Sequence, residues 1–385
     1  MILYYRRLVS EHSRIYAFQR ALEACVHPGD VVCEIGAGLG TYSFLASQAG
    51  ASRVYAIEEG PVIDIAKKLY DANSKDLGTI EFIHQHSTLV VLPEKVDIVI
   101  YENFGSLGLT PVAGCILEDA FERFLKPGGT FVPNGMKLYL AAIQADTLWG
   151  ETIKCLNEND ERVLGLDYSL LRHLAVNERI QTSYGPDVLL CDPLIVHSLN
   201  LNECQELFFS HELEIEMIQP GILHGFGCWT DFDFPGGYTY SQVYNKSATY
   251  ARSFFPMPKP VAVQPGESVH MHLSVMKKPF PDYTCTWWGE VMDRKGKIKT
   301  KWKSSTLHLL PFQSNDINLP KSFDAGYHPK LNKEGHIRKF ILEQMNGSIT
   351  IDTIAHKVID QFPDEFPSFA EAFTRVIRIV KKCAI

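Results

Sequence analysis

The feature that most constrains the fold of this chain is an apolar strand that runs directly into a glycine-rich turn. The segment VVCEI (31–35) is followed by GAGLG (36–40) and then by TYSFLASQAG (41–50), which has helical spacing. Glycines between a strand and a helix permit left-handed backbone conformations and let a ligand lie against the helix N-terminus. The pattern predicts a ligand-binding loop at the edge of a parallel sheet.

Short apolar runs continue to alternate with helical segments from residue 8 to about residue 133. The predicted strands are 31–35, 52–57, 80–84 and 96–101, and the helices predicted between them are 41–50 and 62–73. Strands that alternate with helices imply a doubly wound parallel sheet. We therefore expect an α/β fold that begins with a Rossmann-like, cofactor-binding domain over residues 1–133.

The pattern changes twice after Pro133. Residues 134–310 are rich in aromatic side chains and in period-2 alternation between Gly and Pro turns, which predicts an antiparallel β-barrel or sandwich domain. Residues 311–329 have the composition of a linker. Residues 326–385 return to helical spacing, in segments near 334–345, 350–361 and 367–382, and predict a small helical or winged-helix module.

Composition excludes several classes of protein. The 37 Lys and Arg residues against 45 Asp and Glu residues give a formal charge of −8, which argues against a general electrostatic grip on nucleic acid. The nine cysteines are scattered without a Cys-x-x-Cys pair, as expected of reduced thiols in a cytosol. The N-terminus lacks the apolar core of a secretory signal, and no stretch of about 18 apolar residues occurs. We therefore expect a cytoplasmic protein without a membrane partner.

Two acidic residues narrow the choice of cofactor. Glu58 ends the next predicted strand, where a carboxylate suits the ribose diol of NAD or of S-adenosylmethionine. The glycines Gly36, Gly38 and Gly40 are spaced G-x-G-x-G, unlike the G-x-G-x-x-G of dinucleotide sites. Glu34, just before them, would repel a pyrophosphate but can face the cationic amino-acid end of S-adenosylmethionine. The residues favour S-adenosylmethionine.

The same segment carries a family resemblance. Residues 31–73 resemble the cofactor half of the protein arginine methyltransferases, and the match continues through LPEKVDIVIYENFG (92–105) to RFLKPGGTFVPN (123–134). The segment LVSEHSRIYAFQRAL (8–22) is similar to the family's M-L-x-D-x-x-R-x-x-x-Y helix. The resemblance extends more loosely to about residue 306. It implies a class I, S-adenosylmethionine-dependent N-methyltransferase whose barrel, over 134–310, serves substrate binding and homodimerisation.

The resemblance also implies roles for single residues. Arg14 takes the place of the arginine that clasps the cofactor carboxylate; the alternative is an exposed helix arginine. Glu102 follows the strand VDIVIY and takes the place of the first of two glutamates that grip a substrate guanidinium; the alternative is a loop carboxylate that caps the next helix. Ser87 and Thr88 follow the third strand, where class I methyltransferases place adenine contacts.

The chain departs from the family at three places. The second loop glutamate falls at Pro111, and the barrel's Thr-His-Trp loop aligns with residues 248–250, so its histidine is missing while Tyr250 remains as a pocket wall. The N-terminal Tyr-Phe-x-x-Tyr helix that closes over the cofactor is expected to be missing as well. Four acidic residues elsewhere are candidates to replace the lost carboxylate: Glu118, Asp119, Asp231 and Asp233.

These departures leave the acceptor open. The favoured reading is N-methylation of a side chain in a peptide or protein by Glu102 and some other group. The alternatives are a small-molecule amine or guanidine N-methyltransferase of the same fold, and a non-catalytic binding or scaffold protein that kept the fold.

The segment ILEQMNGSITIDTIAHKVIDQF (341–362) resembles the PqqD-like domain with which many enzymes of ribosomal-peptide modification hold a leader peptide. It implies a leader peptide as a partner, added as a strand to a wing or laid in an adjacent groove. The alternative is a helical module that packs on the barrel or assists dimerisation. The pairs His84/His86 and His270/His272 lack a cysteine or an acidic residue at ligand spacing, so no metal is predicted.

Overall fold

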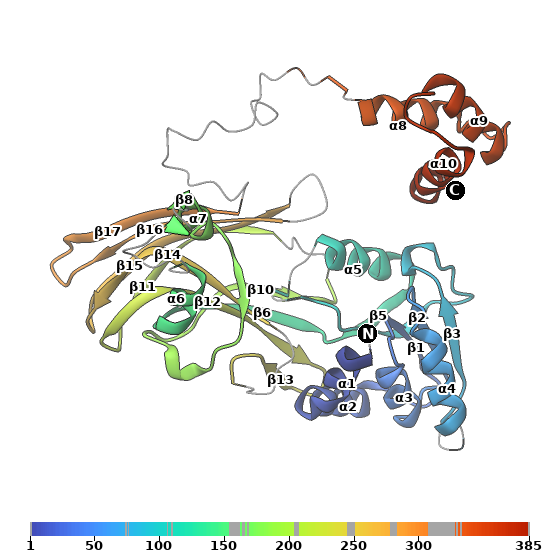
Figure 1. Cartoon of the computed structure of the whole chain (residues 1–385). Helices are drawn as coiled ribbons and strands as arrows, with labels where there is room; N and C mark the ends of the chain where they lie inside the picture. The colour runs from blue at the N-terminus through green and yellow to red at the C-terminus, as the bar shows by residue number, and fades with distance from the viewer. Residues whose placement is uncertain are drawn as a thin grey trace. The chain divides into compact units, whose positions relative to one another are not determined.

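The computed structural model describes residues 2–383 apart from 74, 76, 106, 109–110, 154–161, 164–165, 168, 204–207, 245–250, 278–282, 307–327, 329 and 332. The chain divides into two compact units, Met1–Ser314 and Asn315–Ile385. Figure 1 labels their elements from the blue N-terminus to the red C-terminal helices. The first unit holds one parallel sheet, two large antiparallel sheets and a two-stranded antiparallel sheet. The predicted linker, 311–329, lies almost entirely outside the described residues.

The parallel sheet has five strands in the order β3-β2-β1-β4-β5. Its strands are β1 (Val31–Ile35), β2 (Arg53–Glu58), β3 (Ile80–His84), β4 (Val96–Tyr101) and β5 (Leu125–Val132). The central strand β1 is buried over its whole length, as expected where helices cover both faces of a sheet. The strand order reverses between β1 and β4, and ligands of open α/β sheets bind at the carboxyl ends of strands at such a point.

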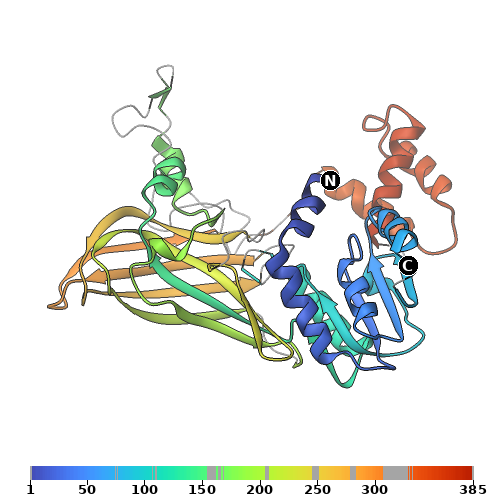
Figure 2. The same cartoon turned by 90° about the horizontal axis from the view of Figure 1, so that it is seen from below.

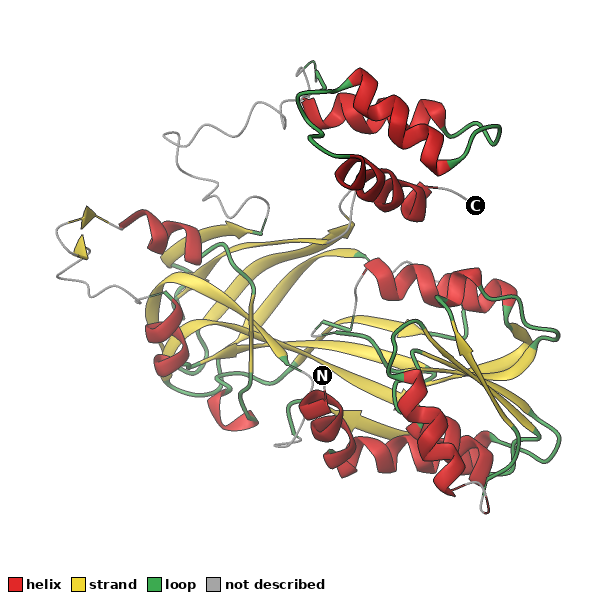
Figure 3. Ribbon diagram, turned by 45° about the vertical axis from the view of Figure 1, so that its right-hand side comes forward, coloured by secondary structure: helices red, strands yellow, loops and turns green. Residues whose placement is uncertain are grey.

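Helices flank this sheet, as Figure 3 shows in red. They are α1 (Ile2–Ser10), α2 (His12–Cys25), α3 (Thr41–Gln48), α4 (Ile63–Asn73) and α5 (Pro111–Arg123), with a single 3₁₀ turn, η2 (Ser87–Leu89). The predicted helices 41–50 and 62–73 correspond to α3 and α4, so the alternation of strands and helices is confirmed.

The predicted β domain consists of two antiparallel sheets (Figure 2). One has the order β10-β6-β12-β14-β9 with β13 paired to β12, and the other has the order β11-β15-β16-β17. The first sheet comprises β6 (Gly135–Ile143), β9 (Ile180–Thr182), β10 (Leu194–Asn200), β12 (Gly221–Phe234), β13 (Tyr238–Ser241) and β14 (Arg252–Val263). The second comprises β11 (Phe209–Glu216), β15 (Ser268–Lys277), β16 (Tyr283–Met292) and β17 (Ile298–Ser305).

Short elements lie between these strands. They are α6 (Asp146–Thr152), β7 (Arg162–Val163), β8 (Leu166–Asp167), α7 (Ser169–Ala175) and the 3₁₀ turn η3 (Pro186–Val188). Aromatic pairs join the two antiparallel sheets: the ring centroids of Phe226 and Trp302 lie 5.5 Å apart, and those of Phe255 and Trp287 lie 5.1 Å apart. Such pairs add to the stabilisation from apolar burial, so the interior between the two sheets is a packed aromatic core.

The β domain and the parallel sheet share one apolar core. Phe18 of α2 stacks on Tyr42, with centroids 4.1 Å apart, and meets Phe234 at the end of β12 at 4.9 Å. Phe104, just after β4, lies 4.9 Å from Phe232 of β12. These contacts fix the end of β12 and the hairpin that follows it against the carboxyl edge of the parallel sheet.

The second unit contains three helices in its described part: α8 (Lys333–Gln344), α9 (Ile351–Gln361) and α10 (Phe369–Cys383). They surround a separate apolar core that includes Ile341, Val358 and Val376. Thr350 caps α9 by accepting a hydrogen bond from the backbone of Thr353. The helical form of the module is confirmed, whereas the described residues of this unit include no strand that would form a wing. None of the helices described in either unit is both long and apolar enough to span a membrane.

Candidate functional site

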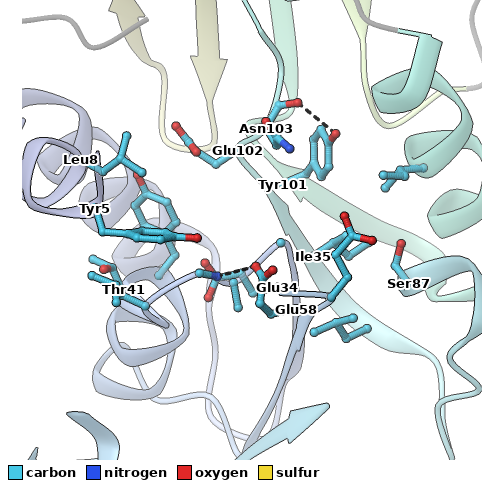
Figure 4. Close-up of a pocket in the computed structure, with 18 of the residues that line it drawn as sticks. Tyr5, Leu8, Glu34, Ile35, Thr41, Glu58, Ser87, Tyr101, Glu102 and Asn103 are labelled. Atoms are coloured by element: carbon cyan, nitrogen blue, oxygen red, sulfur yellow. Dashed lines mark hydrogen bonds between the residues drawn. The ribbon is translucent and has the colours of Figure 1, made fainter. Parts of the chain in front are cut away.

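A cavity of about 330 Å³ opens at the carboxyl ends of β1, β2 and β4. Figure 4 shows side chains from α1, the glycine loop, β2 and β4 around it. Most of the residues singled out from the sequence line this cavity: Arg14, Glu34, Gly36, Gly38, Glu58, Ser87 and Glu102. Its size is in the range of small-molecule and cofactor pockets.

The glycine loop forms the floor of the cavity and is held by Glu58. The backbone N–H of Gly38 donates to Glu58 Oε2 over 2.9 Å, and the N–H of Gly60 donates to Glu58 Oε1 over 2.7 Å. Gly38 has a φ of +54°, in the left-handed region that favours glycine. A carboxylate has about four lone-pair sites, so Glu58 keeps the capacity to accept hydrogen bonds from a ligand diol while it orders the loop.

Glu34 is buried and anchors the start of α3. Its Oε2 accepts hydrogen bonds from the Ser43 backbone N–H (2.7 Å) and the Ser43 hydroxyl (2.5 Å). Burial raises the pKa of Glu34 to about 8 in spite of the lowering effect of the Ser43 hydrogen bonds, with smaller contributions from the negative charges of Glu102 and Glu58. A cationic ligand in the cavity would favour the ionised form of this carboxyl.

Replacement of Glu34 by Gln is expected to change how thermal stability depends on pH. Native Glu34 keeps its proton up to about pH 8, whereas an ordinary glutamate in the unfolded chain loses it near pH 4.5. The native state therefore binds more protons over this range, and its stability falls as the pH rises toward 8. Thermal unfolding of both chains from pH 6 to pH 9 should show the wild type losing a few degrees relative to Glu34→Gln. Parallel curves would contradict this.

Arg14 and Glu102 meet at the opposite end of the cavity from Ser87. Arg14 Nη1 donates to Glu102 Oε1 over 2.5 Å, and Arg14 Nη2 donates to the carbonyl oxygen of Leu8 over 2.9 Å. Arg14 is only 3% exposed, while the Glu102 side chain is 22% exposed. The alternative of an exposed helix arginine is therefore wrong. Glu102 keeps a face toward the cavity, and a guanidinium with five N–H donors can bind a further carboxylate there.

The family's Tyr-Phe-x-x-Tyr motif is missing, as expected, but another N-terminal helix lines the cofactor site. Helix α1 lies over the cavity, and its side chains Tyr4, Tyr5, Leu8 and Val9 line it. A Cβ atom placed on Gly38 would lie 3.2 Å from Cε1 of Tyr5, so the Tyr5 ring packs directly on the glycine loop. Burial raises the pKa of both tyrosine hydroxyls. The motif comparison missed this helix because these tyrosines do not have the family's Tyr-Phe-x-x-Tyr spacing.

Two predicted positions, Thr88 and Gly40, differ from expectation in detail. Ser87 is buried and lines the cavity, but Thr88 is exposed and its hydroxyl lies 2.7 Å from Nδ1 of His86 instead. Gly40 is not a lining residue; it precedes α3 with a φ of +77° and starts that helix. Asn103, which was not predicted, lines the cavity beside Glu102 and accepts a hydrogen bond from the Tyr101 hydroxyl through its carbonyl oxygen.

The four acidic residues considered as replacements for the missing glutamate do not line the cavity. Asp119 pairs with Arg123 at 2.6 Å, and Asp233 pairs with Lys137 at 2.7 Å. Asp231 is buried in the β domain, and its burial raises its pKa to about 6. The acidic residues that do line the cavity are Glu34, Glu58, Glu59 and Glu102. Residues 248–250, with Tyr250, lie outside the described residues, and Pro111 is the first residue of α5.

The donor set fits S-adenosylmethionine. Glu58 offers acceptors for a ribose diol, Arg14 offers a cation for a carboxylate, and buried Glu34 offers an anion for an ammonium group. Ser87 lies at the β3 side of the cavity, where a base would follow the ribose. In the described part of the chain, no three His, Cys, Asp or Glu side chains are grouped as a metal site.

Comparison with known sequences identifies relatives of one kind. A family model described as the arginine methyltransferase oligomerization subdomain matches residues 135–285. Protein arginine N-methyltransferase 1 of Dictyostelium discoideum is 26% identical over 338 residues, which cover 86% of this chain and 88% of that protein. Protein arginine N-methyltransferase 6 of Xenopus laevis is 28% identical over 243 residues, which cover 60% of this chain and 70% of that protein.

Solved structures share the fold. The Trypanosoma brucei PRMT1 enzyme-prozyme heterotetrameric complex with AdoHcy contains a chain that superposes with a TM-score of 0.70 at 18% identity, covering 78% of this chain and 96% of that one. Arabidopsis thaliana protein arginine methyltransferase 10 superposes with a TM-score of 0.68 at 21% identity, covering 79% of this chain and 97% of that one. The combination of a parallel sheet with antiparallel sheets is therefore an established architecture.

Proposed function

Because the chain is a class I S-adenosylmethionine-dependent methyltransferase similar to the protein arginine methyltransferases, we propose that it methylates a guanidinium nitrogen of arginine in a peptide or protein. The observation that carries this proposal is the position of Glu102. Its carboxylate stands at the end of β4, lines the same cavity as the glycine loop, and is held by buried Arg14. Cationic acceptors need such a fixed carboxylate next to the methyl donor.

The residues that line the cavity have different roles in the reaction. When bound, S-adenosylmethionine would supply a methyl group already activated on a sulfonium sulfur. Arg14, Glu34 and Glu58 bind and orient the cofactor, and Tyr5 covers the glycine loop. Glu102 accepts hydrogen bonds from the acceptor guanidinium, neutralises it and turns one nitrogen toward the methyl carbon. The new N–C bond would form as the S–C bond breaks and its bonding pair returns to sulfur, and the acceptor nitrogen would then release a proton to water.

A single carboxylate at Glu102 distinguishes this site from a two-glutamate loop. Asn103 is the neighbouring lining residue after the same strand, and the other acidic lining residues come from β1, from β2 and from the turn after β2. We propose that the acceptor is held by Glu102 on one side and by uncharged groups on the other. One full charge is enough to neutralise one guanidinium.

We further propose that the substrate is a ribosomally made peptide precursor whose leader binds the C-terminal helices. What supports this is the PqqD-like segment on α8 and α9 and the independent apolar core of the unit Asn315–Ile385. Leu342 and Ile351 are apolar side chains that remain exposed on these helices. We also propose a homodimer, supported by the match of residues 135–285 to an oligomerization subdomain; light scattering measures the mass directly.

One panel of substrates tests the proposed reaction. We expect a synthetic peptide with a single arginine to gain 14 Da by mass spectrometry, and the matched lysine and citrulline peptides to stay unmodified. Free arginine or agmatine methylated as fast as the peptide would favour the small-molecule alternative. No methyl transfer to any of them, with intact cofactor binding, would favour a non-catalytic scaffold.

The same panel tests the leader proposal when the chain is shortened to residues 1–314. This cut follows the boundary between the two compact units. The shortened chain should methylate a short core peptide at the rate of the full chain but lose at least about tenfold in kcat/KM on the same core preceded by a leader segment. Equal kcat/KM values on both peptides would reject leader binding.

A further inference from the structure

A chain of buried polar contacts runs from the β domain to Glu102. The hydroxyl of Tyr240, on β13, donates a hydrogen bond to Glu11 Oε1. Glu11 Oε2 lies 4.0 Å from Nε of Arg14, and Arg14 Nη1 donates to Glu102. Tyr240, Glu11 and Arg14 are 5%, 1% and 3% exposed; Arg14 and Glu102 line the cavity, whereas Tyr240 and Glu11 lie behind them.

Glu11 occupies the junction between two helices that line the cavity. It follows the last residue of α1 and directly precedes α2, and its backbone N–H donates to the Leu8 carbonyl oxygen over 3.4 Å. The same Leu8 oxygen accepts a hydrogen bond from Arg14 Nη2. Arg14 therefore bridges the end of α1, the carboxylate of Glu11 and the carboxylate of Glu102.

Glu11 also faces a second buried guanidinium. It lies near Arg252 on β14, whose pKa is lowered by burial against the raising effects of the nearby Tyr184, Tyr240 and Glu11. The Glu11 carboxylate thus faces two guanidiniums, those of Arg14 and Arg252. Buried charges are stable only when they are paired and hydrogen-bonded, and such groups hold one another in a single geometry. A surface interaction would not restrict the side chains in this way.

From this geometry we propose that Tyr240 and Glu11 are positioning residues of the methyltransferase site: they hold the Arg14 guanidinium so that it reaches both Glu102 and the cofactor carboxylate. The β domain then sets the orientation of the acceptor-binding carboxylate through one hydroxyl. The part that concerns the acceptor rests on the proposed function, whereas the part that concerns the cofactor does not.

The first test removes only the hydroxyl of Tyr240. Tyr240→Phe should weaken S-adenosylhomocysteine binding about threefold and raise the KM for the arginine peptide about fivefold, with one cofactor still bound per chain. A purely structural role would lower the bound stoichiometry and leave KM unchanged. The matched control is Tyr238→Phe, on the same strand but 39% exposed, which should leave the affinity, KM and kcat at their wild-type values.

The second test asks whether the hydroxyl acts through Glu11. Glu11→Gln removes the charge and Glu11→Asp keeps it, so the aspartate variant should recover more cofactor affinity than the glutamine variant. In a double-mutant cycle read by calorimetry, Tyr240→Phe should change the S-adenosylhomocysteine Kd about threefold in the wild type and less than about 1.5-fold in Glu11→Gln. Equal effects in both backgrounds would overturn the proposal, as would equal behaviour of the aspartate and glutamine variants.

The two readouts separate this proposal from the proposed function. Coupling in cofactor affinity without methylation of any arginine peptide would reject the proposed function and retain the positioning of Arg14. Methylation of the arginine peptide without coupling in cofactor affinity would retain the proposed function and reject the positioning of Arg14. If Glu11→Gln does not fold, the comparison of Tyr240→Phe with Tyr238→Phe still decides, because the proposal fails when the two variants bind the cofactor and the peptide alike.

Discussion

Glu102→Gln is expected to lower turnover on an arginine peptide at least about 100-fold, which is about 2.7 kcal/mol of activation free energy, while S-adenosylhomocysteine affinity stays within about threefold. The amide has the same size and still offers an oxygen to Arg14 Nη1, which lies 2.5 Å from Oε1 in the wild type. What it lacks is the negative charge that neutralises and orients the acceptor guanidinium. The effect should therefore be confined to steps that involve the acceptor.

Steady-state kinetics and calorimetry on the same preparations measure both quantities. Glu94→Gln is the matched control, because it removes one carboxylate from the same unit at a position that is 42% exposed and pairs with Arg53 at the surface. Such exposed pairs contribute little, so this variant should retain wild-type kinetics. A Glu102→Gln turnover within threefold of wild type would remove Glu102 from the mechanism.

Gly38→Arg is expected to weaken cofactor binding at least about 100-fold, because the new side chain must enter the cavity that the cofactor occupies. Two features of this position disfavour the arginine side chain. The backbone φ of +54° is unfavourable for any residue with a Cβ, and that Cβ would already lie 3.2 Å from the Tyr5 ring. The Gly38 N–H that orders Glu58 would also be displaced, so the diol-binding carboxylate would lose its position.

Gly29→Arg is the matched control for backbone strain. Gly29 also has a positive φ, of +103°, but it lies before β1, is exposed, and has no atoms within 4 Å of an added Cβ. Both arginine variants should lose a similar amount of thermal stability, on the order of 1 kcal/mol, whereas only Gly38→Arg should lose cofactor affinity. An S-adenosylhomocysteine Kd that is the same for Gly38→Arg and the wild type would place the cofactor elsewhere.

Local patterns in the sequence predicted most of the elements of the α/β domain. The predicted strands 31–35, 80–84 and 96–101 are β1, β3 and β4 with the same bounds. A fully buried strand has a continuous apolar run, and a helix beside it has apolar residues repeating every 3.6 residues. Each element can therefore be predicted from a few neighbouring residues. The three C-terminal helices were predicted within two residues at each end for the same reason.

The cofactor end of the cavity was also predictable, because its residues follow directly from strand ends. Glu34, Gly36, Gly38, Glu58, Ser87 and Glu102 all line it, and each lies at or just beyond the carboxyl end of β1, β2, β3 or β4. In a parallel sheet the carboxyl ends of the strands lie at one edge. The order of strands along the chain therefore predicts that residues at these ends lie close together. Thr88 and Gly40 fell outside the lining by a single turn of backbone.

The α1 cover was missed for a different reason. Tyr4 and Tyr5 do not follow a known spacing, and nothing local says that a helix of nine residues will pack over a loop 30 residues later. Only the packed structure places the Tyr5 ring on Gly38. A motif search compares residue types at fixed spacings, whereas a helix that covers a site needs only an aromatic surface of the right shape.

What the sequence by itself determined is therefore the parallel sheet, the glycine loop and the carboxylates at its strand ends, since all of these depend on residues close together along the chain. What only the tertiary structure decided is which groups hold those carboxylates. Arg14 reaches Glu102 across 88 residues, and Tyr240 reaches Glu11 across 229 residues. Such pairs form because a buried charge is stable only beside a partner that the fold brings near. The partner is distant along the chain, so no local pattern of residues predicts it.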